Sequence, residues 1–232
     1  MQVKLLWRVC LGLLLIGIAG GCDALNGKPE VNSNAAANAV QPIFAVKVGD
    51  ADFTGSAGRQ ISDAYQPETT IKGLLAASGL VTFAGDGKSL ETVNQISLSP
   101  GMAWQIQLNG KKAADLNAVV KREDTILITA EPLQDAEFQP VILTVNGGSS
   151  QPELTHSYVM PYTEDLTVRG MLKSSGLAHL AENNKTLLAV KEYKPLSNEE
   201  WKLKLNDKTL LDSGIDMKLR IQDKLEISLV LR

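Results

Sequence analysis

The sequence TIKGLLAASGL at residues 70–80 returns as TVRGMLKSSGL at residues 167–177, an offset of 97 positions. In both copies the apolar residues fall at i, i+3 and i+4, which predicts a short helix with one buried face. Gly79 and Gly176 suit the left-handed residue that ends a helix, and a leucine follows each of them. We therefore expect two copies of one small module.

The same offset of 97 extends over most of the chain. It relates WQIQLNGK at 104–111 to WKLKLNDK at 201–208, and only near the end does it become 99. A shared offset over such a length indicates a tandem duplication. We place the modules at residues 43–132 and 140–232. The shared positions are mostly apolar or turn-forming, whereas exposed positions differ, so the copies should share a fold and present different surfaces.

The pattern of each module predicts strands around the helix. Alternating apolar residues open the modules near residues 44–48 and 141–145. We expect second strands at 60–65 and 155–162, an extended segment at 92–98, and last strands at 125–130 and 224–231. Thr69 and Asp165 are the expected helix N-caps. Gly73 and Gly170, inside the helices, suggest a close approach of helix to sheet.

The tryptophan strands carry the most conspicuous aromatic residues. Trp104 is in phase with Ile106 and Leu108, which predicts that it faces the core and is not a ligand platform. Trp201 has the same phase in the second copy. Asn109-Gly110 predicts a tight hairpin turn after the first strand. The element order predicts an α+β fold of two tandem β-grasp (ubiquitin-like) modules, each a mixed sheet with one packed helix.

The N-terminal residues predict a secretion signal and a lipid anchor. Residues 1–21 have a charged start, an apolar run too short to span a membrane and a small-residue end, as in a signal peptide. The run Ala19-Gly20-Gly21-Cys22 resembles a bacterial lipobox, so Cys22 is the expected lipidation site. An ordinary secretory signal or a short membrane anchor is the alternative. Residues 22–42 have the composition of a flexible tether, with an end-to-end distance of roughly 25 Å.

Composition excludes several functions. The 232 residues include 23 basic and 26 acidic ones, and this small acidic surplus argues against nucleic-acid binding. The chain has two cysteines: Cys10 would leave with the signal and Cys22 would carry lipid, so neither a disulfide nor a catalytic thiol is expected.

Two copies of a further pattern resemble a known family. A helix with a Leu pair is followed by Trp-x-x-x-Leu-Asn-Gly-Lys and a short Asp-x-Ile strand, at 74–75, 104–111 and 124–126, with counterparts at 171–172, 201–208 and 223–225. This pattern resembles an uncharacterised bacterial lipoprotein family whose domains are similar to the C-terminal β-grasp domain of transcobalamin. Glu123 and Gln222 stand where such domains often have glycine. The resemblance implies a secreted or lipid-anchored protein. In transcobalamin a helical domain completes the corrinoid site, and this chain has no such domain, so cobalamin is not the expected ligand.

Candidate reactive residues do not form a recognisable pattern. His156 and His179 occupy unmatched positions without metal-ligand spacing, and we expect both at the surface. Tyr65 and Tyr162 precede the helices and should pack there, with the hydroxyl bonded to backbone. Four acids lack the spacing of a calcium loop and should lie in solvated turns: Asp50, Asp52, Asp86 and Glu91. Gly147-Gly148 is internal and not a C-terminal carrier motif. No catalytic residue, metal ligand or cofactor is predicted.

We therefore expect a non-enzymatic lipoprotein, held on the outer side of the bacterial cell membrane by lipid on Cys22. It would recognise a small ligand, a glycan or a surface partner through loops, the groove between modules or an exposed sheet edge. The alternative is a structural or accessory subunit of a cell-envelope or transporter assembly. A large exposed apolar patch would favour the second possibility, and a pocket lined by both modules the first.

Overall fold

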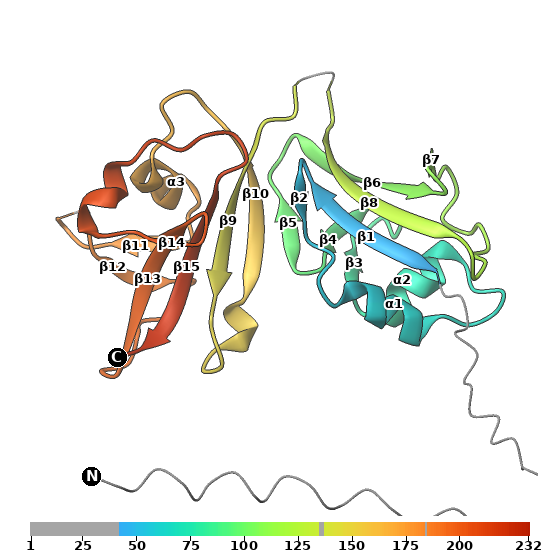
Figure 1. Cartoon of the computed structure of the whole chain (residues 1–232), viewed down its shortest axis with the longest axis horizontal. Coiled ribbons are helices and arrows are strands. Elements are labelled where there is room, and N and C mark those ends of the chain that lie inside the picture. Colours follow the sequence, from blue (N-terminus) through green and yellow to red (C-terminus); the bar gives the residue numbers. More distant parts are fainter. Residues whose placement is uncertain (1–41, 135–136, 184) are drawn as a thin grey trace, which may run out of the picture. The chain divides into compact units, whose positions relative to one another are not determined.

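The computed structural model describes residues 42–134, 137–183 and 185–232. The expected signal peptide, the expected lipidation site Cys22 and nearly all of the expected tether lie outside the described residues. The fold is a mixed α+β fold that consists mostly of sheet, as predicted. We call residues 43–133 the first half and residues 140–232 the second half (Figure 1).

The first half begins with strands β1 (Ile43–Val48) and β2 (Ala51–Asp52) and helices α1 (Ala57–Ala64) and α2 (Ile71–Ser78). Strands β3 (Val81–Phe83), β4 (Leu90–Val93), β5 (Ile96–Leu98), β6 (Met102–Leu108), β7 (Lys111–Lys112) and β8 (Thr125–Pro132) follow. Five of these strands form a sheet in the order β2-β1-β8-β6-β7, in which β1 and β8 are parallel.

The second half contains β9 (Pro140–Asn146), the 3₁₀ helix η1 (Pro152–Leu154), β10 (His156–Pro161), helix α3 (Val168–Ser174), β11 (Ala178–Leu180) and β12 (Leu187–Val190). It ends with β13 (Glu199–Leu205), β14 (Lys208–Thr209), the 3₁₀ helix η2 (Asp212–Asp216) and β15 (Lys224–Leu231). Its strands run β10-β9-β15-β13-β14, with β9 parallel to β15. This order repeats that of the first half strand for strand.

One sheet continues from the second half into the first. Strand β10 pairs in parallel with β5, and β4 and β3 extend the same eight-stranded sheet. Strand β9 is buried on both faces: Val141, Leu143 and Val145 pack in the core of the second half, whereas Ile142 belongs to the core of the first. A strand buried on both faces reads as a continuous apolar run, as PVILTV does here.

The helix caps explain the glycines in the repeated sequence. Thr70, not the expected Thr69, accepts a 3.1 Å hydrogen bond from Gly73 N–H, and Thr167, not Asp165, accepts one of the same length from Gly170. A Cβ on Gly73 would lie 3.2 Å from the capping Thr70 Oγ1, and no sheet atom lies within 4 Å. The glycine therefore makes room for the cap, and the expected close approach to the sheet is wrong.

Three further expectations have clear outcomes. Residues 60–64 belong to helix α1, which Tyr65 caps, and not to a strand, because Ala57 and Ile61 are buried at the i, i+4 spacing of a helix. The segment 92–98 is interrupted between β4 and β5 at Asn94 and Gln95, which both have positive φ. Gly79 and Gly176 have φ of 68° and 67°, which confirms the left-handed helix ends.

Candidate functional site

The tryptophan strands leave part of their outer edge unpaired. Strand β13 pairs with β15 over its full length but with β14 only at Lys204 and Leu205. Arg232 N–H donates to Asn198 C=O, and Asn206 N–H donates to Lys224 C=O. In an antiparallel pair, hydrogen-bonded residues alternate with residues that are not bonded to the partner strand. The backbone groups of even-numbered β13 residues therefore bond to β15, and those of odd-numbered residues point away from it. The backbone groups of Trp201 therefore face outward.

Four polar backbone groups on this edge have no partner among the described residues. They are the C=O of Glu199, the N–H and C=O of Trp201, and the N–H of Leu203. Beyond them the edge closes, because Leu203 C=O accepts from Leu210 N–H at 2.8 Å. The open run from Glu199 to Leu203 spans about 13 Å at the rise of a strand.

Strand β6 repeats this arrangement in the first half. Its open edge comprises Met102 C=O, both backbone groups of Trp104, and Ile106 N–H, within the part of the chain that the structure describes. Ile106 C=O accepts from Ala113 N–H at 2.9 Å, the counterpart of the Leu203 contact. Both halves thus present the same short, open strand edge, centred on a tryptophan.

Each open edge lies in a hollow. The hollow of the second half has a volume of about 900 Å³ and is lined by β13, the start of β12, the 195–196 loop and residues 209–215. The hollow of the first half has a volume of about 670 Å³ and is lined by β6, residues 87–90 and residues 112–117. Residues 87–90 and 112–117 correspond at the offset of 97 to residues 184–187 and 209–214, so the two hollows occupy matching places in the two halves. Each hollow is lined by residues of its own half. The groove between the modules was one of the binding places that the sequence allowed.

The tryptophan side chains pack against the cores, as predicted from their phase. Trp201 also meets the ring of Tyr193 edge-on, with centroids 6.2 Å apart. Both indole Nε1 atoms are buried without an acceptor among the described residues. A buried indole N–H usually has a partner, so these two donors carry an uncompensated desolvation cost.

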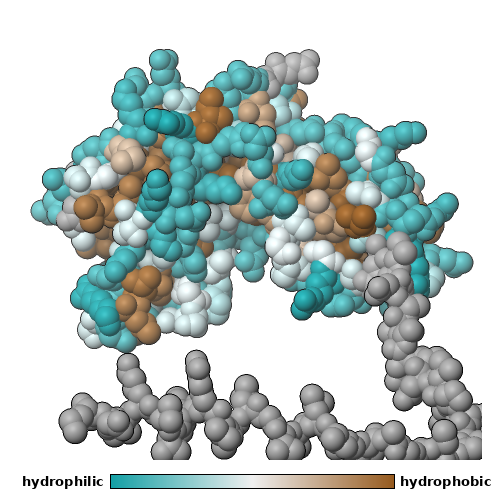
Figure 2. All heavy atoms as spheres, in the orientation of Figure 1, coloured by the Kyte–Doolittle hydropathy of each residue, from teal (hydrophilic) through white to brown (hydrophobic). Residues whose placement is uncertain are grey.

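The rims of the two hollows differ in polarity. Around the second hollow lie Leu188, Leu196 and Leu211, which are 50%, 61% and 78% exposed. At the offset of 97, the first half has Glu91, Ser99 and Ala114 at these positions. Figure 2 shows patches of apolar surface on both halves, so the difference lies in the residues around each hollow. Large exposed side chains of this kind mark contact surfaces when they gather around one feature.

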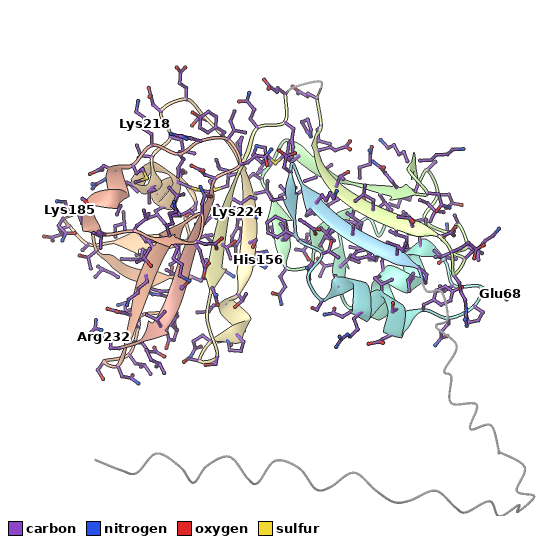
Figure 3. The ribbon with its side chains drawn as sticks, viewed as in Figure 1. Glu68, His156, Lys185, Lys218, Lys224 and Arg232 are labelled. Carbon is purple, nitrogen blue, oxygen red and sulfur yellow. The ribbon has the colours of Figure 1, made fainter. Side chains whose placement is uncertain are left out.

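Charged groups complete the rim of the second hollow. Glu200 lies 3.0 Å from Lys202 Nζ and 3.6 Å from Arg232 Nε, and these cations lower its pKa. Lys185 has no side-chain partner within the described ranges. Lys185 and Arg232 both lie on the outer side of the second half, away from β10 (Figure 3).

A buried carboxylate positions the loop that carries Leu196. Glu199 is 3% exposed, and it accepts 2.7 Å and 3.0 Å hydrogen bonds from the Tyr193 hydroxyl and the Leu196 N–H. These bonds, the hydroxyl first, lower the pKa of Glu199. The carboxylate is thus held by its own loop and acts as a positioning group for the rim.

The first hollow is more polar. Glu131 accepts from Gln105 Nε2 at 2.8 Å and from Thr129 Oγ1 at 3.2 Å. Lys72 Nζ donates to Gly87 C=O at 2.6 Å and lies 5.5 Å from the centroid of Phe83. The same backbone edge therefore faces different side chains in the two halves.

The structure does not bring the sequence candidates together. His156 bonds through Nε2 to Ser97 Oγ at 2.8 Å, and His179 lies 3.0 Å from Glu192. His156 is only partly exposed, because it lies where β10 meets β5. Among residues 42–134, 137–183 and 185–232, no group of histidine, cysteine and acid side chains could hold a metal ion.

Of the four acidic candidates, Asp50 and Asp86 lie in turns, as predicted, whereas Asp52 ends strand β2 and Glu91 lies in strand β4, so the expectation is wrong for these two. Asp86 caps its own loop through hydrogen bonds from Lys88 N–H and Ser89 N–H, which hold its pKa at about 2. Asp52 accepts from Thr54 N–H at 2.7 Å, and Asp50 bonds to Gln222. Glu91 is an exposed residue of β4.

The remaining candidates have structural positions. The Tyr65 hydroxyl donates to Val120 C=O at 3.4 Å, and Tyr162 packs against the core of the second half. Gly147 lies in the β9–η1 loop, where a Cβ would come within 1.7 Å of Gln151 O. No helix in the described part of the chain is long and apolar enough to cross a membrane.

Sequence reasoning missed the two hollows and the leucine rim. The open edge follows from strand pairing, which the repeat does not show. The rim, however, has a signal in the sequence: at three aligned positions the second copy has leucine where the first has Glu91, Ser99 and Ala114.

Comparison with known proteins gives little further information. No family model matches the chain, and no curated protein is similar to it. A solved structure from Ruminococcus gnavus, described as a "putative metal binding protein", is similar at 17% identity with a TM-score of 0.32, over 40% of this chain and 98% of that one. A likeness at that TM-score supports no assignment.

Proposed function

We propose that this protein is a non-enzymatic, extracytoplasmic binding lipoprotein with two tandem β-grasp modules, and that it binds its partner in the hollows beside the tryptophan strands. The observation that carries the proposal is the recurrence of one open strand edge in one hollow, at Trp104 and again at Trp201. Matching strand orders in the halves support the tandem module arrangement. A duplicated edge with divergent rims suits recognition of more than one feature of a partner.

The anchor in this proposal is lipid on Cys22. Its support is the sequence alone: a short apolar run, small residues and a cysteine. Acyl chains on Cys22 would hold the folded halves at the outer face of the membrane. The test is Cys22→Ala in the native host. The variant should lose membrane association and acyl labelling, and its continued sedimentation with membranes would contradict the anchor.

An accessory subunit of an envelope or transporter assembly is the second candidate. The observation that favours it is the exposed leucine rim at Leu188, Leu196 and Leu211, because such a rim suits a protein partner better than a glycan. A permanent subunit would co-purify at a fixed stoichiometry through dilution and washing. A reversible binding protein would lose its partner under the same treatment.

Native mass spectrometry of the full-length protein from its own host tests the binding function. We expect a bound ligand or partner in the wild-type protein. The paired variants Gln105→Ala and Lys202→Ala each change one side chain that lines a hollow next to its tryptophan, and they serve to assign the ligand to a hollow. A protein that carries no ligand, and that no host component binds when added back, would contradict the proposed function.

A further inference from the structure

The hollow of the second half contains an unpaired strand edge whose chemistry specifies its occupant. We infer that this hollow binds an extended polypeptide segment of a partner protein, which adds as a strand to β13 at Trp201 and places apolar side chains among Leu188, Leu196 and Leu211. The inference deepens the proposed function and rests on it.

The backbone supplies the first argument. A donor and an acceptor at Trp201, with one further acceptor at Glu199 and one further donor at Leu203, repeat at the spacing of a strand. Only another extended main chain presents acceptors and donors with this alternation. Up to four main-chain hydrogen bonds can form, and they would give affinity that does not depend on side-chain sequence.

The rim supplies the second argument. Side chains of an added strand alternate between its faces, so every second one would meet the walls of the hollow. Those walls carry the three exposed leucines, and Leu187, Leu203 and Leu210 also line the hollow. The occupant should therefore have apolar residues at alternate positions. Lys185, which has no side-chain partner within the described ranges, favours an acidic residue at the end of the segment that lies near it.

The depth of the edge argues against a second copy of this chain. Strand β13 lies within a hollow flanked by β14 on one side and by the 195–196 loop on the other. In a symmetric dimer each β13 would have to reach past the flanks of the other. A single segment from a chain end or a loop has no such flanks, and it fits an open run of about 13 Å.

The first hollow provides a control within the same molecule. It has the same backbone edge at Trp104 but no leucine rim: the positions aligned with the three leucines are Glu91, Ser99 and Ala114, of which Ala114 lines the first hollow. If the backbone edge gives affinity and the rim gives selectivity, exchange of these three residues between the halves should exchange the selectivity for apolar segments.

The experiment uses the full-length protein in detergent micelles and a library of random dodecapeptides displayed on phage. Selection against the wild-type protein should enrich peptides with alternating apolar residues. A synthetic copy of the strongest peptide should bind at least tenfold more weakly to the variant Leu188→Glu/Leu196→Ser/Leu211→Ala, which carries the residues of the first half. The matched control Val119→Ser/Ile221→Ser removes exposed apolar residues outside both hollows and should bind as the wild type does.

Two measurements distinguish strand addition from simple apolar contact. Two peptides are compared, each N-methylated at one of the two alternating sets of backbone amides. Methylation of the set that faces β13 should abolish binding, whereas methylation of the other set should leave it, because only one set of amides faces β13. Amide hydrogen exchange at Trp201 and Leu203 should slow when the peptide binds, whereas exchange at Lys202, already bonded to β15, should not change. Equal tolerance of methylation at both sets of amides, or unchanged exchange at Trp201, would overturn the inference.

The remaining outcomes separate this inference from the proposed function. Peptides that bind the triple variant as well as the wild type overturn the inference and leave a binding function in place. The inference also fails if no peptide is enriched, and the proposed function then depends on the native mass spectrum. If Trp201 is already protected in the free protein and loses protection when residues 24–41 are replaced by a Gly-Ser linker, the occupant is the chain itself, which overturns the inference.

Discussion

Gln222 and Asp50 lie 172 positions apart in the sequence and meet through two hydrogen bonds of 3.0 Å. The Gln222 amide donates to the Asp50 carboxylate and accepts from the Asp50 backbone N–H. Gln222 has a φ of 67°, a left-handed conformation that suits glycine. This residue therefore keeps a strained backbone and uses its side chain to join the second half to the first.

The Gln222 contact predicts that a glycine variant is more stable than an alanine variant at this position. Gln222→Ala should lower the free energy of unfolding, because it loses the two bonds and keeps the strained φ. Gln222→Gly loses the same bonds but relieves the strain, so it should be more stable than the alanine variant by about 1 kcal/mol. Denaturant unfolding of both variants measures this difference. An alanine variant as stable as the glycine variant would contradict the strain.

The Asn109–Asp124 pair predicts a difference between the halves. Asn109 Nδ2 donates to Asp124 at 2.8 Å, and Lys121 N–H donates to the other carboxylate oxygen at 2.7 Å. Asp124 is 6% exposed, so Asp124→Ala should cost about 2 kcal/mol of stability because it leaves buried donors unpaired.

Asn206 and Asp223 repeat this pair at 2.8 Å in a more exposed place. Asp223→Ala is therefore the matched variant, and its cost in the free energy of unfolding should be smaller. Thermal unfolding of the two variants under identical conditions compares them. Equal losses would show that burial does not set the strength of this motif.

His156 predicts a dependence of stability on pH. Burial where β10 meets β5, together with the nearby Lys191, lowers the pKa of His156 in the folded state. The unfolded chain then binds the proton more readily, so stability is full above the unfolded pKa of about 6.5 and falls as pH decreases toward the folded pKa.

Unfolding measured between pH 7.5 and pH 5 checks this slope. His156→Gln should flatten it, because glutamine does not titrate and can keep the bond to Ser97. Ser97→Ala should retain it, because burial is the largest cause of the shift. A slope that persists in full in His156→Gln would assign the pH dependence to another group.

The sequence predicts the shared fold better than the site. Shared apolar phases place Trp104 and Trp201 on the core side, and the glycines at 79 and 176 end the helices as expected. Helix α1 was missed because the repeat suggested a strand at 60–65, although the Ala57 and Ile61 spacing is helical. The open edges depend on which strands pair and where β7 and β14 stop, and pairing of this kind is a tertiary property that periodicity does not encode.

The buried indole N–H groups, which have no acceptor within the described part of the chain, predict that replacement of either tryptophan by phenylalanine lowers the free energy of unfolding only slightly. Trp201 Nε1 is buried without an acceptor among the described residues, so its N–H carries a desolvation cost of about 1–3 kcal/mol. Trp201→Phe removes this group along with some apolar area, and the two effects should nearly cancel. Trp201→Ala removes the ring and its contact with Tyr193, so it should cost about 3 kcal/mol.

Trp104 provides the matched test, because its Nε1 is buried in the same way while its hollow has a polar rim. Denaturant unfolding of the phenylalanine and alanine variants at both positions gives the free energies of unfolding of the four variants. Small losses for both phenylalanine variants, beside large ones for alanine, would show that the rings act by packing. A loss of 2 kcal/mol or more in Trp201→Phe would mean that the indole N–H has a partner in solution.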